Sequence, residues 1–273
     1  MRAIGRPVSS QAANTVNPSL HRMADYGPAV VVMVTLLALW ELYVRSGAIS
    51  QIFLPSPIVI GQALWDNWDV ISTHTMQTLI ETVLGLGAAT LTGFLLAVLL
   101  DLSPAVRKAV YPLLVISQTI PLIALAPLLV MWFGFDLEPK IIVIIIYCFF
   151  PIAVACADGL QSTDSDLVRL MRSMNATRWQ LLWMVRLPGA MPSFFSGLRI
   201  AATYSVTAAI FAEYVGAYQG LGIYMQTSFN SHAVALVFAA IVVTAILSIL
   251  LFAFVSLIER IVLPWQQGVT GPT

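Results

Sequence analysis

Residues 158–192 read DGLQSTDSDLVRLMRSMNATRWQLLWMVRLPGAMP and form a polar segment between two long apolar runs. Apolar side chains recur from Leu167 to Met174 at the i, i+3, i+4 and i+7 spacing of one helical stripe. Asp164 or Ser165 is expected to cap the start of this helix. Asn175 then interrupts it, because asparagine tolerates the left-handed conformation in which a helix can stop.

A second short helix is expected to begin near Trp179 and to end at Pro188, since proline interrupts helical hydrogen bonding. The polar segment therefore predicts two short amphipathic helices joined by a bend. Apolar runs bound it on both sides, so its apolar stripe must pack on the rest of the protein, on lipid headgroups or on another protein.

The composition is that of an integral membrane protein. Of 273 residues, 59% are hydrophobic and only 10% are charged, against about 25% charged in soluble proteins. A helix needs about 20 apolar residues to cross a bilayer. The sequence offers six candidate spans, at residues 28–44, 79–100, 113–135, 141–157, 194–215 and 233–258. Because these runs are continuous rather than alternating, an all-α membrane protein is predicted instead of a barrel.

The basic residues predict the orientation, because Lys and Arg collect on the cytoplasmic side. With the amino terminus inside, ten of them fall in cytoplasmic segments, and only Arg45 and Lys140 fall outside. An even number of spans then puts both termini and the polar segment in the cytoplasm. Residues 1–27 are expected to form a disordered cytoplasmic tail, residues 28–265 the membrane domain and residues 266–273 a second cytoplasmic tail.

A spaced pattern runs through the polar segment: Arg169-Leu170-Met171, three residues, Asn175, nine residues, then Val185-x-Leu187-Pro188. This resembles the EAA loop of bacterial ABC importer permeases, whose pattern is E-A-A, three residues, Gly, nine residues, I-x-L-P. The Leu-Pro end and the spacing match, whereas the E-A-A triplet does not. The family's Gly is Asn175 here, which makes the same bend at a modest cost.

Other segments resemble the branch of this family that takes up nitrate, sulfonate, taurine and thiamine precursors. They are Ile120-Pro121, Ala126-Pro127-Leu128, Trp132-Phe133-Gly134, Gly197-Leu198-Arg199 and Ala212-Glu213. Residues 170–174 and 200–205, the latter including Tyr204, are closer to members that carry pyrimidine-type thiamine precursors. The resemblance covers roughly residues 54–265.

The resemblance implies a type I ABC importer permease fold with about six transmembrane helices in the bacterial inner membrane. It implies a homodimer, embedded in lipid, that works with ABC ATPase subunits and a periplasmic binding protein and has no nucleic-acid partner. The residues that it assigns to ATPase coupling are Arg169, Leu170, Met171, Ser173, Met174, Asn175, Ala176, Thr177, Trp179, Leu187 and Pro188.

No Walker A sequence occurs in the chain, so the ATPase is expected to be a separate polypeptide that binds ATP and Mg²⁺. This chain is expected to bind no cofactor or metal and to catalyse no bond chemistry. The solute is expected to be a thiamine-precursor pyrimidine or similar heterocycle, or else a sulfonate, nitrate or taurine.

Four residues are candidates for the transport pathway or its hinges. Pro121 and Pro127 lie in the third apolar run, where each is either a hinge or a structural kink. Glu213, near the outer end of the fifth run, either lines an outer vestibule or extends to water. Tyr204 lies in the same run.

Other polar residues receive simpler interpretations. Arg199 is expected to pair with Asp158 or Asp101 as a structural anchor, and Glu81 is expected to be solvated at the interface. His74 and His232 are expected to be surface residues in outside loops.

The small residues of the apolar runs are interpreted as packing residues. Gly85, Gly87 and Gly93 are expected to allow close helix contact. Cys148 and Cys156 are expected to be buried thiols.

The alternative function is a secondary, ion-coupled carrier. Such a carrier needs buried carboxylates near the middle of the bilayer or an internal repeat. Glu213 is the one candidate, and no repeat is visible. An intramembrane enzyme is less favoured still, because no Ser/His or His/Asp constellation is visible within the spans.

Overall fold

The computed structural model describes residues 18–265, and the chain divides into two compact units that meet at residues 58 and 59. The first unit contains helix α1 (Pro18–Arg45). The boundary predicted between tail and span at residues 27 and 28 falls inside this helix. The rest of the predicted amino-terminal tail and the tail at 266–273 lie outside the described residues. Helix α2 (Pro57–Asp66) contains the boundary between the units.

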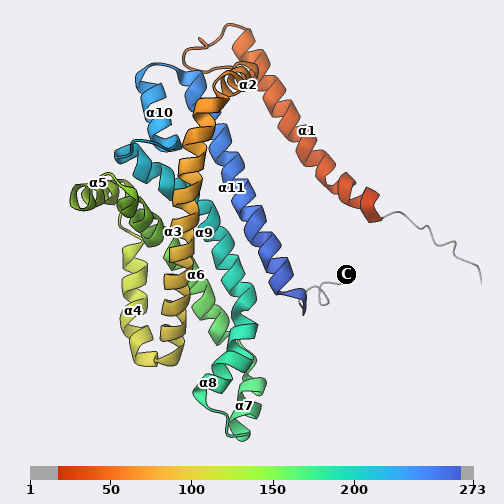
Figure 1. Cartoon of the computed structure of the whole chain (residues 1–273). Coiled ribbons are helices and arrows are strands. Elements are labelled where there is room, and N and C mark those ends of the chain that lie inside the picture. Colours follow the sequence, from red (N-terminus) through yellow and green to blue (C-terminus); the bar gives the residue numbers. More distant parts are fainter. Residues whose placement is uncertain (1–17, 266–273) are drawn as a thin grey trace, which may run out of the picture. The chain divides into compact units, whose positions relative to one another are not determined.

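The described part of the second unit consists of helices joined by short connections (Figure 1). Its elements are α3 (Trp68–Leu102), α4 (Pro104–Ser117), α5 (Leu122–Phe133), α6 (Leu137–Gln161), α7 (Ser165–Ser173), α8 (Arg178–Leu181), a π-helical turn (Leu182–Arg186), α9 (Leu187–Val215), α10 (Leu221–Asn230) and α11 (Val234–Val262).

Within residues 18–265, five helical stretches are long and apolar enough to cross a membrane. They are Gly27–Arg45, Trp68–Leu102, Leu137–Gln161, Arg178–Val215 and Val234–Val262, and the bent pair α4 and α5 makes a sixth if it counts as one span. The prediction of an all-α membrane protein with about six spans is confirmed.

The apolar run 113–135, in which Pro121 and Pro127 were each expected to be a hinge or a kink, does not form one continuous helix. Helices α4 and α5 are bent by 96° at a short break. Pro121 lies at this break, in an extended conformation immediately before α5. Proline lacks the amide hydrogen of a helical bond and disfavours a helical conformation in the residue before it. Pro127 lies within α5 without ending it.

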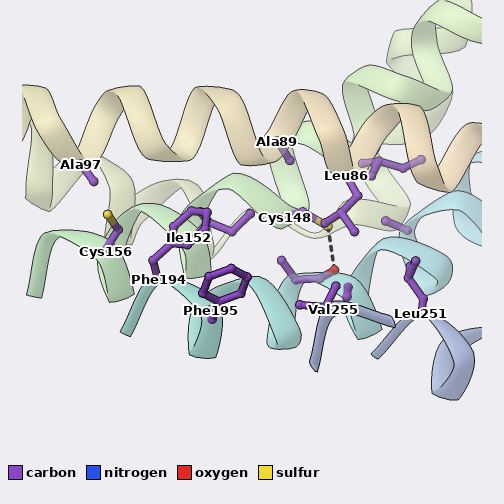
Figure 2. Packing of buried hydrophobic residues seen from close by; sticks show 14 of the residues in the cluster. Leu86, Ala89, Ala97, Cys148, Ile152, Cys156, Phe194, Phe195, Leu251 and Val255 are labelled. Carbon is purple, nitrogen blue, oxygen red and sulfur yellow. Dashed lines mark hydrogen bonds between the residues drawn. The ribbon is translucent and has the colours of Figure 1, made fainter. Parts of the chain in front are cut away.

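The core forms where α6 packs between α3 and α9 (Figure 2). Cys148, Ile152 and Cys156 of α6 are fully buried there. The Cys148 thiol donates to the carbonyl of Ala201 on α9 at 3.4 Å. Both cysteines are free, which confirms their interpretation as packing thiols.

Two glycines of α3 allow α6 to approach closely. A Cβ at Gly85 would lie 2.6 Å from the Cβ of Ile144, and one at Gly93 would lie 2.8 Å from the carbonyl of Phe149. Gly87 has no neighbouring heavy atom within 4 Å of such a Cβ, so its predicted role in close packing is wrong. It lies two residues from Gly85, on a different face of the helix.

Candidate functional site

The polar segment forms a helix, a bend and a second helix at one end of the second unit (Figure 1). Helix α7 begins as predicted, because the Asp164 side chain accepts from the amide of Asp166 at 2.8 Å. No residue of α7 is buried. Of the predicted coupling residues, Arg169, Leu170, Met171 and Ser173 lie on α7, Met174 to Thr177 form the bend, Trp179 lies on α8, and Leu187 and Pro188 open α9.

The bend at Asn175 has the predicted left-handed backbone, with φ of 59°. The Asn175 amide donates to the carbonyl of Arg172, and the Ala176 amide donates to that of Met171, both at 3.0 Å. These bonds satisfy carbonyl groups that the end of α7 would otherwise leave free.

A capping box after the bend was not predicted from the sequence. The Thr177 hydroxyl accepts from the Gln180 amide at 3.3 Å, and the Gln180 side chain accepts from the Thr177 amide at 2.8 Å. The Thr-x-x-Gln spacing is a known signal for such a box. With this cap, the turn from Asn175 into α8 has a defined geometry.

The second helix does not end at Pro188, contrary to the prediction. Helix α8 passes through the π-helical turn directly into α9, in which Pro188 occupies the first turn. Proline is tolerated in the first turn, where its missing amide hydrogen costs no helical bond. The polar segment is therefore joined to the span α9 without an intervening loop.

An ion pair anchors the π-helical turn to a second span. The Nη1 atom of Arg186 donates to both carboxylate oxygens of Asp101, at 2.6 and 2.8 Å. The Asp101 side chain is 5% exposed, and it lies near the end of α3. A charge-assisted contact this short and this enclosed is among the stronger hydrogen-bonding interactions in proteins.

Arg199 does not pair with Asp158 or Asp101 as predicted. Its Nη1 lies 3.2 Å from Glu259 of α11, so it links α9 to α11. Asp101 is bound by the π-helical turn, and Asp158 lies 3.5 Å from Arg107 of α4. Arg199 is thus an anchor, but between different helices.

The apolar side chains of the polar segment are largely exposed. Those with at least half of their surface exposed are Leu170, Met174, Trp179, Trp183 and Met184. Met174, next to the bend, is 70% exposed. The apolar stripe therefore does not pack on the rest of this protein, and lipid headgroups and another protein are the two alternatives that remain. A cluster of apolar groups beside arginines offers a surface for another protein or for lipid headgroups.

The candidate pathway residues are spread along the second unit. Tyr204 is 45% exposed, and its ring lies 5.5 Å from that of Tyr147 on α6. Glu213 follows nine residues later on α9, about 14 Å along the helix axis. Pro121 marks the break between α4 and α5, and Pro127 lies within α5. These residues do not form one cluster.

Glu213 is fully buried, so the expectation that it lines an open vestibule or extends to water is wrong for this arrangement. Its carboxylate accepts from the Thr78 hydroxyl and from the Gly222 amide, each at 2.6 Å. Thr78 accepts in turn from the Leu221 amide at 2.9 Å. Glu213 therefore helps to bind the first amides of α10, which are the ones that a helix leaves without partners.

His74 belongs to the same contact and is not in an outside loop as predicted. It lies in α3, and its Nδ1 accepts from the Gly220 amide at 3.0 Å. His232 does lie in a turn, between α10 and α11, with φ of 60°. Side chains from α3 and α9 therefore accept from three consecutive amides at the start of α10.

Glu81 is also buried, contrary to its predicted solvation. It pairs with Lys140 of α6, with the Nζ and Oε1 atoms 2.7 Å apart and side-chain exposures of 5% and 0% for the lysine and the glutamate. Gln77 donates to the same oxygen at 2.8 Å. The signal in the sequence was a charged residue within an apolar run, which by default marks a functional position.

Within the described residues, no group of three or more His, Cys, Asp or Glu side chains is arranged to hold a metal ion. The polar segment offers a surface for docking, and the opposite end of the bundle contains buried charge pairing.

Comparison with known proteins gives one family. Residues 89–264 match the model of the family described as binding-protein-dependent transport system inner membrane component. The chain is 41% identical over 237 residues to the formylaminopyrimidine transport permease protein ThiX of Halalkalibacterium halodurans, with 85% of this chain and 93% of that protein covered. It is 32% identical over 246 residues to the taurine transport system permease protein TauC of Escherichia coli, with 87% and 89% covered.

Among solved structures, the fold is similar to a chain of the MetNI methionine ABC transporter in an inward-facing conformation. The TM-score is 0.62 at 21% identity, with 71% of this chain and 96% of that chain covered. A chain of an amino acid ABC transporter gives a TM-score of 0.59 at 18% identity, with 73% of this chain and 97% of that chain covered.

Proposed function

Because the chain belongs to the family of binding-protein-dependent transport system inner membrane components, we propose that it carries a pyrimidine-type thiamine precursor or a similar heterocycle. The chain is the multi-pass permease subunit of an ATP-driven importer in the inner membrane. The 41% identity to a formylaminopyrimidine permease supports the solute. A sulfonate, nitrate or taurine is the second choice, and the relative named for taurine supports it at lower identity.

The polar segment is proposed to be the surface on which an ATPase subunit docks. The observation that carries this role is the capped left-handed bend at Asn175, with Met174 and Trp179 exposed on either side of it. A rigid projection with exposed apolar tips suits a groove in a partner protein. Residues 173–179 are the proposed contact. ATP and Mg²⁺ are proposed to bind to the partner, and this chain is proposed to catalyse no bond chemistry.

The complete importer is proposed to contain two copies of this chain, ATPase subunits and a periplasmic binding protein. Large apolar side chains of α5 and α11 are exposed, among them Ile123, Met131, Trp132, Ile249 and Phe254. Lipid and the second copy are proposed to cover them. Substrate choice is proposed to rest mainly with the binding protein.

The test is to purify the tagged chain gently from its native membrane and to identify the proteins that accompany it by mass spectrometry. We expect an ATPase with a Walker A sequence and a binding protein. The binding protein is then screened by thermal shift against formylaminopyrimidine, taurine, an alkanesulfonate and nitrate. Stabilisation by formylaminopyrimidine alone supports the proposed solute, whereas stabilisation by taurine or nitrate replaces it.

Uptake into proteoliposomes separates the importer from a secondary carrier. The importer needs ATP inside the vesicle and tolerates a proton ionophore. Uptake that continues without ATP and collapses with the ionophore would refute ATP-driven transport.

A further inference from the structure

A buried ionic network lies at the end of the second unit opposite the polar segment, where α10 meets α3 and α9 (Figure 1). It contains two acids, Glu81 and Glu213, and one base, Lys140, all of them buried. They come from three different spans, α3, α9 and α6. Through Glu213 and its neighbours, the network also binds the first turn of α10.

The network contains more acids than bases. Lys140 contacts Glu81 at 2.7 Å, while the carboxyl groups of Glu81 and Glu213 lie close enough to interact with each other. The second carboxylate oxygen of Glu81, Oε2, has no donor within the described part of the chain. The buried site therefore contains two acids and one base, and the base contacts only Glu81.

Stability alone does not explain such a site. Removing two charges from water costs several kcal/mol per ion, and apolar residues of similar volume are often as stabilising as a buried pair or more so. A buried ion pair contributes more clearly to the selection of one conformation over another than to stability.

An open pocket of about 180 Å³ borders Lys140, the basic member of the pair, but does not reach Glu81. Lys140 and Gln77 line it together with Asp136, Tyr218 and Gln219. These last three residues belong to the connections before α6 and before α10. If these connections move away from α3, water in the pocket reaches Lys140 and Glu81. The desolvation penalty of the pair then falls, which favours the separated arrangement relative to a wholly apolar contact.

We propose that the Glu81–Lys140 pair is a conformational latch of the transport cycle. It is dry and paired when the outer ends of α3, α6 and α9 are together, and it becomes hydrated when they separate to admit solute. Glu81, Lys140 and Glu213 are positioning residues in this scheme. The latch rests on the proposed importer function but not on the identity of the solute.

The test replaces both members of the pair by apolar residues of similar volume, Glu81→Leu with Lys140→Met. We expect the double variant to melt at or above the wild-type temperature in detergent. In complex with its ATPase and binding protein, its uptake should nevertheless fall at least tenfold. A stable double variant with normal uptake would overturn the latch. A double variant that melts well below wild type would assign the pair to folding and would also overturn it.

A second readout does not require the solute. Gln219→Cys places a thiol in the pocket wall, while the natural cysteines are fully buried. With a membrane-impermeant thiol reagent, the labelling rate should differ at least threefold between nucleotide-free and ATP-trapped complexes. The Glu81→Leu/Lys140→Met background should abolish this difference. Retention of the difference would refute the latch even if the proposed solute is correct, and its loss would support the latch even if the solute is wrong.

Discussion

The contact between α3 and α6 can be tested at two glycines that lie two residues apart on the same helix. At Gly85 an added Cβ would lie 2.6 Å from the Cβ of Ile144, whereas carbon atoms in contact prefer about 3.5–4.0 Å. The Ile144 Cβ is bonded directly to its own backbone, so no rotation of χ1 moves it away. Gly85→Ala therefore requires the two helices to separate by about 1 Å. At Gly87 the added Cβ meets nothing within 4 Å.

The expected magnitudes follow from two opposing effects. Alanine in place of glycine stabilises a helix interior by about 1 kcal/mol, and this gain applies to both positions. Overpacking a tight contact costs roughly 1–3 kcal/mol, and this cost applies only to Gly85. Gly85→Ala should therefore destabilise by up to about 2 kcal/mol, and Gly87→Ala should stabilise by up to about 1 kcal/mol.

The assay is thermal unfolding of the purified proteins in one detergent, followed by size-exclusion chromatography of the soluble fraction. Because the helix gain applies to both variants, their stabilities differ by the overpacking cost alone, roughly 1–3 kcal/mol, which corresponds to about 2–12 °C for a domain of roughly 200 residues. We expect Gly85→Ala to melt below Gly87→Ala by that margin. Equal melting temperatures, or a lower value for Gly87→Ala, would refute the close α3–α6 contact.

Three further predictions concern the polar segment and its anchor. Asn175→Val should cost about 1–2 kcal/mol at the left-handed bend and should reduce ATP-driven uptake without affecting membrane insertion. The control variant Asn175→Gly should keep normal uptake. Normal uptake in the valine variant would argue against the bend. Met174→Asp should leave the melting temperature unchanged, because the side chain is 70% exposed, but should release the ATPase in a pull-down; an intact complex would place the contact elsewhere. Asp101→Ala leaves Arg186, whose side chain is 24% exposed, without its carboxylate partner and should cost roughly 2 kcal/mol, seen as a lower melting temperature. Asp166→Ala, which removes a pair with more than 80% of both side chains exposed, is its control and should melt like wild type.

Local signals in the sequence predicted the local structure. The apolar runs predicted the spans, Asp164 predicted the cap of α7, and Asn175 predicted the bend. Each of these features depends on residues within one or two helical turns. The Thr177 capping box is of the same kind and was predictable from its spacing. The break between α4 and α5 was only half predicted, since a proline indicates a bend but not whether the helix continues through it.

Interactions between spans were not predictable in the same way. Glu81 and Lys140 lie 59 residues apart, and their pairing depends on the register between α3 and α6. Arg199 had several acids within plausible reach, and the packing of α11 against α9 brings Glu259 closest. The burial of Glu213 depends on α10 folding back against α3 and α9. Periodicity along one helix contains no information about such registers.

The two ends of the second unit are mechanically connected through α9. At one end, α9 continues the polar segment without a loop, and Arg186 ties the junction to α3. At the other end, Glu213 of α9 binds α10 and lies beside the Glu81–Lys140 pair, which joins α3 to α6. Helices are stiff along their axes, and packed interfaces shift between discrete arrangements more readily than they deform. A displacement of the polar segment therefore reaches α9 directly and α3 through Arg186, and these are the two spans that contribute acids to the buried network. This gives the proposed ATPase contact a direct route to the proposed latch.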